Sequence, residues 1–331
     1  MQKHKNLDTR QPVRRRYTFW DFLCVISIVG VWPRFIEPSI ISVSHKKAQV
    51  SKLPVDKLKI LQISDLHLTA NTSKSFLRKI INKAKFLQPD IIVFTGDFSC
   101  YGNIQEPNLL RQFLQQFNAP YGCYAVLGNH DYESYLSINA NGDYDLTPAP
   151  KSMLKQAFLR FFKTSPTLTG LTTQSAKNLS PNKELVELLA DTPFQLLHNR
   201  TVSININGGI LNLTGLGEHM AADVLPQKAF GTIPDSKEHS RIILLHNPDG
   251  LPLLKNYPGE IVLCGHTHGG QINLPWLWKK FTLLENRNFK KGILKIDGKW
   301  VYINRGIGGA LPFRWFSTPE ILLLTLEQHG S

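Results

Sequence analysis

Short polar motifs, each placed directly after an apolar run, carry the side chains of this sequence that could do chemistry. In chain order they are Asp65-Leu66-His67, Gly96-Asp97, Gly128-Asn129-His130-Asp131, His246-Asn247 and Gly265-His266-Thr267-His268. One motif of this kind is more often a satisfied polar cluster than a pair of metal ligands. A whole series of them, each behind an apolar run, favours a shared site.

The donor atoms of these motifs are typical of a site for transition-metal ions. The set supplies nitrogen and oxygen donors without a thiolate, which suits Mn, Fe, Zn or Co better than Ca. The expected ligands are Asp65, His67, Asp97, Asn129, His246, His266 and His268. They are more than one tetrahedral ion needs, but they can hold two adjacent ions that activate a water and grip phosphoryl oxygens. The motifs therefore predict phosphoester hydrolysis with two divalent ions. Mn²⁺ is the expected metal, and Fe, Zn or Mg are the alternatives.

Apolar runs that precede the motifs predict the strands that must position them. The runs lie at 59–64, 90–95, 121–127, 241–245 and 260–264. Apolar residues at helical spacing predict helices at 75–86 and 109–117, and further strands are expected at 292–296, 300–304 and 321–326. In an open α/β sheet the carboxyl ends of the strands line one crevice, so the motifs are expected to converge there. Gly96, Gly128 and Gly265 stand where each strand must turn sharply.

The ordered set of motifs resembles the calcineurin-like metallophosphoesterase superfamily, over a stretch from Lys59 to Leu326. The resemblance implies an α/β fold, a four-layer αββα sandwich of two mixed β-sheets around a dinuclear centre. It implies that one ion is held by Asp65, His67, Asp97 and His268. It implies that the other is held by Asp97, Asn129, His246 and His266, with Asp97 bridging. His130, outside the ligand set, would stabilise the developing charge and protonate the leaving oxygen.

Further strings resemble the membrane-associated branch of this superfamily. They are residues 64–67, 265–271 and 304–308. That branch includes a pyrophosphatase of lipid A assembly, so the resemblance implies an anionic nucleotide-linked lipid, UDP-2,3-diacylglucosamine, as substrate. Attack by a metal-bridging hydroxide would release UMP and 2,3-diacylglucosamine 1-phosphate. The alternatives are another phosphodiester or phospholipid as substrate, and a non-catalytic binding module. An acidic residue that many relatives carry shortly after the Gly-Asp is missing from residues 98–101.

The first fifty residues differ from the rest in composition and predict a membrane-associated segment. A basic run at 14–16 precedes apolar residues from Phe19 to Trp32, roughly a dozen strongly apolar positions where about 20 are needed to span a bilayer. Four interpretations compete: an interfacial anchor, a marginal spanning helix running through Pro33, an export signal and a helix packed on the domain. We expect residues 1–50 to attach the protein to the cytoplasmic face of the inner membrane, with export and anchoring as the alternative.

The rest of the chain is expected to form one metallophosphoesterase domain, 57–327, with an insertion or lid at 132–200. Within the insertion, an aromatic stripe beside basic residues at 151–163 predicts an amphipathic helix, either core filler or a membrane-facing lid. The formal charge of +13 favours anionic partners such as a membrane surface. The basic residues do not interleave with stacking aromatics, so no nucleic-acid partner is expected, nor an obligate protein partner.

Two charged residues near the motifs have alternative roles. Arg305 stands in a glycine-rich turn, where its guanidinium could clamp a substrate phosphate or pair with Glu320. Asp131 is expected to orient a neighbouring histidine rather than bind metal. The four cysteines form no CxxC pair, which excludes zinc-ribbon and thioredoxin motifs.

Overall fold

The first of two six-stranded sheets carries the amino-terminal motifs. The computed structural model describes residues 17–162, 166–233 and 239–328. In this sheet the strand order is β1-β14-β2-β3-β4-β7. The strands are β1 (Ser42–Val50), β14 (Glu320–Gln328), β2 (Lys57–Ile63), β3 (Ile91–Thr95), β4 (Cys123–Val126) and β7 (Phe194–Leu196). Only the β14–β2 pair is antiparallel among these neighbours, so the sheet is mixed.

The second sheet carries the carboxyl-terminal histidine motifs. Its order is β12-β13-β11-β10-β9-β8. The strands are β12 (Gly292–Ile296), β13 (Lys299–Ile303), β11 (Ile261–Cys264), β10 (Ser240–Leu244), β9 (Gly209–Gly215) and β8 (Arg200–Ile206). The two outer pairs are antiparallel hairpins and the inner pairs are parallel, so this sheet is mixed as well.

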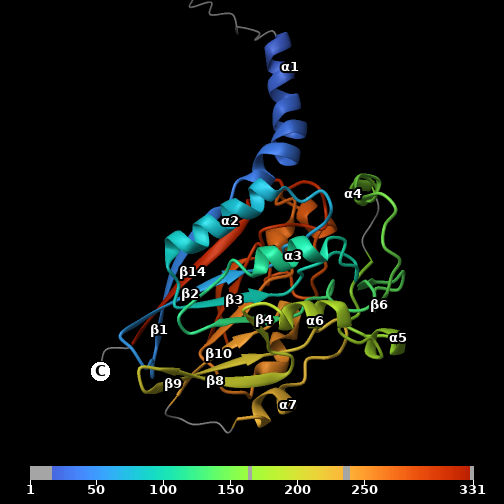
Figure 1. Cartoon of the computed structure of the whole chain (residues 1–331). Coiled ribbons are helices and arrows are strands. Elements are labelled where there is room, and N and C mark those ends of the chain that lie inside the picture. Colours follow the sequence, from blue (N-terminus) through green and yellow to red (C-terminus); the bar gives the residue numbers. More distant parts are fainter. Residues whose placement is uncertain (1–16, 163–165, 234–238, 329–331) are drawn as a thin grey trace, which may run out of the picture.

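Helices cover the outer faces of both sheets and complete four layers (Figure 1). The first sheet is covered by α2 (Lys74–Leu87), α3 (Pro107–Leu114) and α6 (Lys183–Ala190). The second is covered by α7 (Pro226–Gly231) and by the 3-10 turn Pro248–Leu254. The expected αββα sandwich is confirmed.

Strand β2 shows why the central runs are apolar at consecutive positions. Leu61 and Ile63 pack under the helices, whereas Leu58 and Ile60 pack between the two sheets. Successive side chains of a strand point to opposite faces, and both faces of this sheet are covered by other layers. A continuous apolar run is therefore the pattern that such a strand requires.

The insertion expected at 132–200 contains both core and peripheral elements. Its hairpin β5 (Leu136–Ile138) and β6 (Tyr144–Leu146), and helices α4 (Met153–Phe162) and α5 (Gln174–Lys177), lie outside the two large sheets. In contrast, α6 buries Leu185 and Leu189 in the core of the first sheet, and β7 pairs with β4. The carboxyl-terminal part of the range is thus part of the sandwich.

Strand β1 lies within the range 1–50 that was assigned to the N-terminal segment. It pairs with β14 along its whole length, from Ser42 opposite Glu320 to Val50 opposite Gln328. Three consecutive exposed polar residues, His45, Lys46 and Lys47, hide its strand character, because an edge strand is covered on fewer sides than a central one. The sheet therefore begins at residue 42, before the expected boundary.

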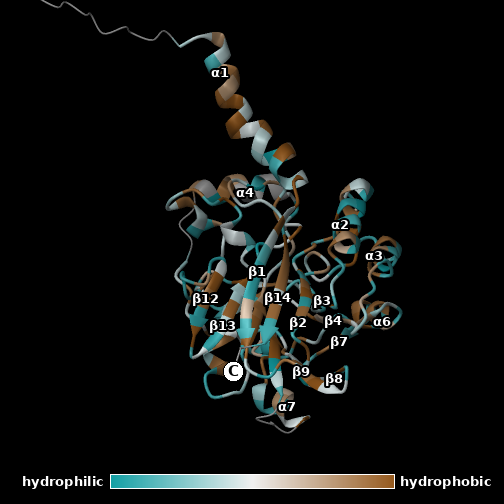
Figure 2. Cartoon of the chain, turned by 90° about the vertical axis from the view of Figure 1, so that its left-hand side faces the viewer, coloured by the Kyte–Doolittle hydropathy of each residue, from teal (hydrophilic) through white to brown (hydrophobic). Residues whose placement is uncertain are grey.

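A single helical rod precedes β1 and projects from the body of the molecule (Figures 1 and 2). It comprises α1 (Phe19–Ile26), a π-helical segment (Ser27–Ile36) and a 3-10 turn (Glu37–Ser39), and it starts with a capping box between Thr18 and Asp21. The span of 21 residues is long and apolar enough to cross a membrane, by length and composition. The apolar run from Phe19 to Trp32 was expected to be too short to span a bilayer. The helix is longer than this run, because it continues through Pro33 in π-type turns. The basic run at 14–16 lies outside the described residues.

The base of this rod is bound to the loop of residues 304–319, which joins β13 to β14. The buried Glu37 carboxylate accepts hydrogen bonds from the backbone N–H groups of Phe316, at 2.9 Å, and Ser317, at 2.7 Å. The Arg314 N–H donates to the Pro33 carbonyl at 2.8 Å. The rod is therefore fixed to the domain at its base rather than joined by a flexible linker.

Candidate metal centre

All the expected ligands follow strand ends at the same border of the two sheets. Asp65 and His67 follow β2, Asp97 follows β3 and Asn129 follows β4. The second sheet supplies the remaining ligands after β10 and β11, namely His246, His266 and His268. The carboxyl ends of parallel strands meet there, which is why residues from distant parts of the chain converge.

The backbone at this border is held in an unusual conformation. Several of the expected ligands have positive φ angles, which are uncommon for residues other than glycine: Asp65 at 55°, His67 at 47°, Asp97 at 60°, His266 at 70° and His268 at 49°. Backbone strain of this kind clusters at functional sites, where the surrounding structure holds it in place. The fold therefore supports a local conformation that positions these side chains.

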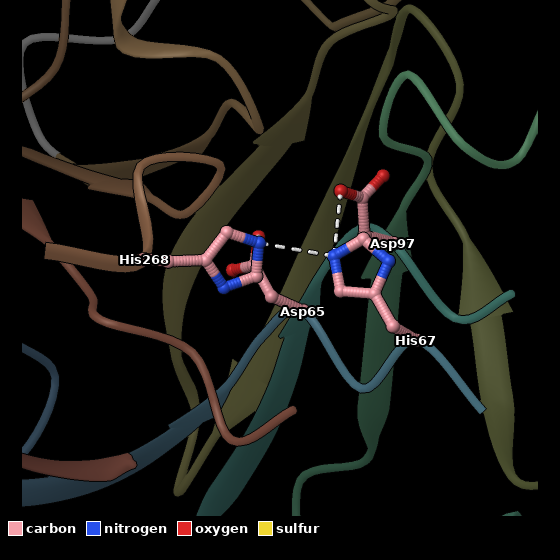
Figure 3. A group of neighbouring side chains, drawn as sticks. All are labelled: Asp65, His67, Asp97 and His268. Atoms are coloured by element: carbon pink, nitrogen blue, oxygen red, sulfur yellow. Dashed lines mark hydrogen bonds and ion pairs between the residues drawn. The ribbon is translucent and has the colours of Figure 1, made fainter. Parts of the chain in front are cut away.

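One group of donors consists of Asp65, His67, Asp97 and His268, whose ligand atoms all lie within 4.8 Å of one another. Figure 3 shows the imidazole of His67 between Asp97 and His268. Its Nε2 atom lies 3.3 Å from Asp97 Oδ2 and 3.1 Å from His268 Nε2. His268 Nε2 lies 3.6 Å from Asp65 Oδ1. These donors are the set that the resemblance implies for one ion.

A second group adjoins the first through Asp97. Its carboxylate, His246 and His266 also have ligand atoms within 4.8 Å of one another. His246 Nε2 lies 3.3 Å from Asp97 Oδ2. Asn129 Oδ1 lies 3.0 Å from His266 Nδ1. Because Asp97 belongs to both groups, the geometry fits two neighbouring ions with a shared carboxylate.

His246 provides the test of whether these residues fit a cation. Its Nδ1 lies 2.6 Å from the Thr95 carbonyl oxygen, which can only accept, so Nδ1 carries a proton. The opposite nitrogen, Nε2, is fully buried, has no hydrogen-bond partner among the described residues and faces the Asp97 carboxylate at 3.3 Å. Buried polar atoms are normally satisfied, and a nitrogen aimed at a carboxylate without a hydrogen bond is suited to a shared cation. The donor set therefore fits divalent metal ions.

The pKa values of the cluster favour cation binding. Burial would raise the pKa of Asp97, but His246, His130 and His67 outweigh it and hold that pKa well below the usual range. Burial lowers the pKa of His67 to about 4 and that of His266 to about 3, so both imidazoles are neutral at pH 7 and keep a lone pair. His246 differs from these two, because the Asp97 carboxylate outweighs burial and raises the pKa of its imidazole well above the usual value. The Asp97 anion and the neutral imidazoles of His67 and His266 are in the charge state that a divalent cation requires.

Gly128 shows why small residues stand beside these ligands. A Cβ atom at this position would lie 2.3 Å from Asp97 Oδ1 and 2.7 Å from His246 Nε2. Any side chain would thus occupy the space between two ligands. The absence of a side chain at Gly128 therefore lets the backbone lie close to both ligands.

His130 lies beside the ligands and belongs to neither group. The Tyr101 backbone N–H donates to His130 Nδ1 at 2.9 Å, so in the neutral ring the proton sits on Nε2. Burial lowers the pKa of His130 to about 3, and its ring lies edge-on to that of His67, with centroids 4.6 Å apart. The ring also lines a small cavity together with Asp97, Asn129 and His266. This is the place expected for a proton donor that does not bind metal.

Asp131 has a different role from the expected one. Its carboxylate accepts the backbone N–H groups of Asp97, at 2.6 Å, Phe98, at 2.9 Å, and Gly128, at 3.0 Å. It therefore fixes the two loops that present Asp97 and Asn129, instead of orienting a histidine. The sequence does not distinguish these roles, since backbone N–H groups are common to every residue.

The 304–319 loop contains two arginines with different contacts, Arg305 and Arg314. Arg305 Nε donates to Glu320 at 3.0 Å and Nη2 to Ser42 at 3.0 Å, which is the ion pair considered as the alternative to a phosphate clamp. Arg314, which sequence reasoning missed, is buried and its Nη2 lies 3.2 Å from His268 Nδ1. The sequence holds no signal for it, because no motif surrounds Arg314.

The insertion contributes side chains to the cavity at the cluster. Tyr135 and Arg160 line it beside His130, and the ring of Tyr135 lies 4.7 Å from that of His130. Arg160 belongs to the amphipathic helix expected at 151–163, observed as α4. On this helix, Phe158 and Phe162 are exposed. The helix therefore presents a basic group to the cavity and aromatic groups to the surroundings.

Comparisons with known proteins agree with this centre. The calcineurin-like phosphoesterase family matches residues 58–270. The UDP-2,3-diacylglucosamine pyrophosphatases LpxG of Chlamydia muridarum and Chlamydia trachomatis are 37% and 38% identical to the chain, covering 90% of it and 92% of each relative. The uncharacterized metallophosphoesterase YkuE of Bacillus subtilis is 27% identical, covering 89% of both chains. The chain is therefore a hydrolase of phosphate ester or anhydride bonds that belongs to the calcineurin-like phosphoesterase family.

Proposed function

We propose that this protein hydrolyses the pyrophosphate bond of UDP-2,3-diacylglucosamine, giving UMP and 2,3-diacylglucosamine 1-phosphate in lipid A biosynthesis. The observation that carries this proposal is similarity over 90% of the chain to two pyrophosphatases of that substrate. The complete double group of ligands and the membrane-length helix support it. A soluble substrate would not account for the helix.

Seven side chains would hold the two divalent ions of this enzyme, with Mn²⁺ as the proposed metal. Asp65, His67, Asp97 and His268 would hold one ion. Asp97, Asn129, His246 and His266 would hold the other. When bound, the ions supply a water of lowered pKa as nucleophile and positive charge against the phosphoryl oxygens.

His130 supplies the proton in this proposal. Its Nε2–H faces away from the Tyr101 N–H that holds Nδ1, and the ring lines the cavity at the cluster. A bound pyrophosphate raises the pKa of this imidazole, because nearby negative charge favours the protonated ring. The proton is then given to the oxygen that leaves with the lipid phosphate as the bond to the uridylyl phosphorus breaks.

Membrane attachment follows from the exposed rod, and we propose the cytoplasmic face of the inner membrane as its location. Export followed by anchoring is the alternative. Protease added to spheroplasts distinguishes the two, because a cytoplasmic domain stays intact and an exported one is degraded.

Hydrolysis by the purified full-length chain tests the proposed function. UDP-2,3-diacylglucosamine in detergent with Mn²⁺ is expected to yield UMP and lipid phosphate in equal amounts, and Asp97→Ala is expected to yield neither. The proposal fails if the wild-type protein leaves this lipid intact while it hydrolyses bis(p-nitrophenyl) phosphate under the same conditions. That result would favour another phosphodiester or a phospholipid as substrate.

A further inference from the structure

A groove of about 830 Å³ lies beside the base of the helical rod, outside the small cavity at the cluster. Its volume is within the range of pockets that bury most of a small ligand. Apolar side chains from four separate regions form much of its wall: Phe35, Pro38, Phe76, Pro150, Leu311 and Phe313. The groove thus joins the rod, the segment before α2, the insertion and the 304–319 loop.

The inner end of the groove reaches the metal centre. His67 and Arg314 line it. Tyr101, Ala310 and Leu311 line both the groove and the cavity that contains His130. The Tyr101 hydroxyl donates to the Ala310 carbonyl at 3.3 Å, so these shared residues form one wall between the two spaces. A molecule lying in the groove therefore has one end at the ligands.

The outer end of the groove lies at the rod. Arg34, Phe35 and Pro38 of the rod line it. Above them the rod exposes a continuous apolar surface, with Phe22 at 61% and Val29 at 53% exposure, and Figure 2 shows it standing clear of the body. A surface of this length and composition is suited to a hydrocarbon environment. The groove consequently opens where the domain meets that environment.

The charges of the groove favour an anionic amphiphile. Among the described residues that line it, none is an aspartate or a glutamate, and the permanently charged ones are Arg34 and Arg314. An arginine at each end and apolar side chains between them match a lipid with acyl chains and a negatively charged head. A soluble sugar nucleotide would leave the apolar wall without a partner.

We propose that this groove receives the acyl chains of the lipid substrate directly from the membrane while the bond to be cleaved lies at the metal centre. This inference rests on the proposed function for the identity of the substrate. The route is short, because the residues of the outer end belong to the rod and those of the inner end include His67. The lipid therefore reaches the ligands without its chains passing through water.

A groove-filling substitution tests the acyl site. Asn71 is exposed and lines the groove, and its side chain makes no hydrogen bond to the rest of the described structure, so Asn71→Trp fills the space without removing one. We expect the KM for UDP-2,3-diacylglucosamine to rise about 10-fold relative to the KM for bis(p-nitrophenyl) phosphate. The matched control, Asn288→Trp, alters an exposed asparagine that does not line the groove and is expected to change neither value. An unchanged ratio in Asn71→Trp overturns the proposal.

A binding experiment separates this inference from the proposed function. Phosphatidic acid with a diazirine at the end of one acyl chain is photolysed with the full-length protein in nanodiscs, and the labelled peptides are mapped. Labels within residues 69–76 and 307–313 support the groove, even if UDP-2,3-diacylglucosamine is not hydrolysed. Labels confined to α4 or to the rod above Arg34 overturn it, even if the lipid is hydrolysed.

Discussion

Asp97 is the residue on which both ligand groups depend. Its Oδ2 atom lies 3.3 Å from both His67 Nε2 and His246 Nε2. We expect Asp97→Ala to lose metal and turnover together, because one carboxylate serves both positions. Metal content by mass spectrometry and hydrolysis of bis(p-nitrophenyl) phosphate measure this, with the exposed Asp56→Ala as control. Full metal content in Asp97→Ala would contradict a shared carboxylate.

A substitution of His130, unlike one of Asp97, should reduce turnover without loss of metal. His130→Ala is expected to keep its metal and to lower kcat by ~10²–10⁴, the usual scale for a general acid. The loss should be smaller for a p-nitrophenyl ester than for the lipid, since a good leaving group needs less protonation. An equal loss for both substrates would assign the residue to charge stabilisation alone.

The sequence predicted which donor side chains converge better than it predicted the residues that support them. Asp65 and His266 could be recognised because a polar residue directly after an apolar run is placed by the strand itself. Arg314 and the contacts of Asp131 depend on backbone carbonyl and N–H groups brought together by tertiary folding. Such groups are present at every position, so no motif marks them.

At the scale of elements, Glu37 connects the rod to the 304–319 loop. The same loop reaches the ligands, because the Ser317 hydroxyl donates to the His268 carbonyl. In Glu37→Gln an amide NH₂ must face one of the N–H donors, leaving a buried group unsatisfied at a cost of about 1–3 kcal/mol. We expect a lower unfolding temperature and weaker metal binding, measured by calorimetry and metal titration. The control is Glu327→Gln, at a partly exposed ion-pair partner of Lys47, and it should change metal binding little.

The contact between His219 and Glu285 predicts a pH-dependent contribution to stability. Their side chains lie 3.0 Å apart, and Tyr144 also donates to Glu285. Burial would lower the pKa of His219, but Glu285, together with Glu218 and Asp249, outweighs it and raises that pKa. The stabilisation is therefore full below the imidazole's unfolded value, about 6.5, and is lost as pH rises through the folded value.

Glu285→Gln measures that contribution. The difference in unfolding temperature between wild type and variant is expected to be large at pH 5.5 and to shrink at alkaline pH. The amide can still accept from Tyr144, so the comparison isolates the ion pair. Equal differences at both pH values would show that the charge of His219 contributes nothing.

Strands that bury both faces could be predicted from their continuous apolar runs. Strands at or near the edges of the two sheets could not. Strands β2, β3 and β11 lie within a residue or two of their expected ranges. Strands β1, β8 and β9 were not predicted, because none of them is a continuous apolar run. β1 exposes His45, Lys46 and Lys47 in succession, and β9 buries the polar residues Asn212 and Thr214. Their place in the sheets depends on pairing with distant partners, which local pattern does not specify.

At the scale of the whole molecule, we expect the rod to attach the enzyme to the membrane that holds its substrate. Ile28 lies in the middle of the rod and is 56% exposed, so Ile28→Asp leaves the domain's packing intact. A carboxylate at the centre of a membrane helix costs about 2.5–3.5 kcal/mol. We expect less protein in the membrane fraction on flotation, with unchanged hydrolysis of bis(p-nitrophenyl) phosphate. An undiminished membrane fraction would show that other surfaces provide the attachment.

The position of β14 has a consequence for biosynthesis. This strand lies between β1 and β2, yet it is translated after every other strand of the structure. Until β14 leaves the ribosome, β1 has no hydrogen-bonded neighbour in the sheet and β2 presents an open edge. Open edges of this kind are a hazard for aggregation. The segment just before β14 contains Phe316 and Ser317, which bind Glu37. The nascent chain thus completes this sheet and binds the base of the rod at nearly the same moment.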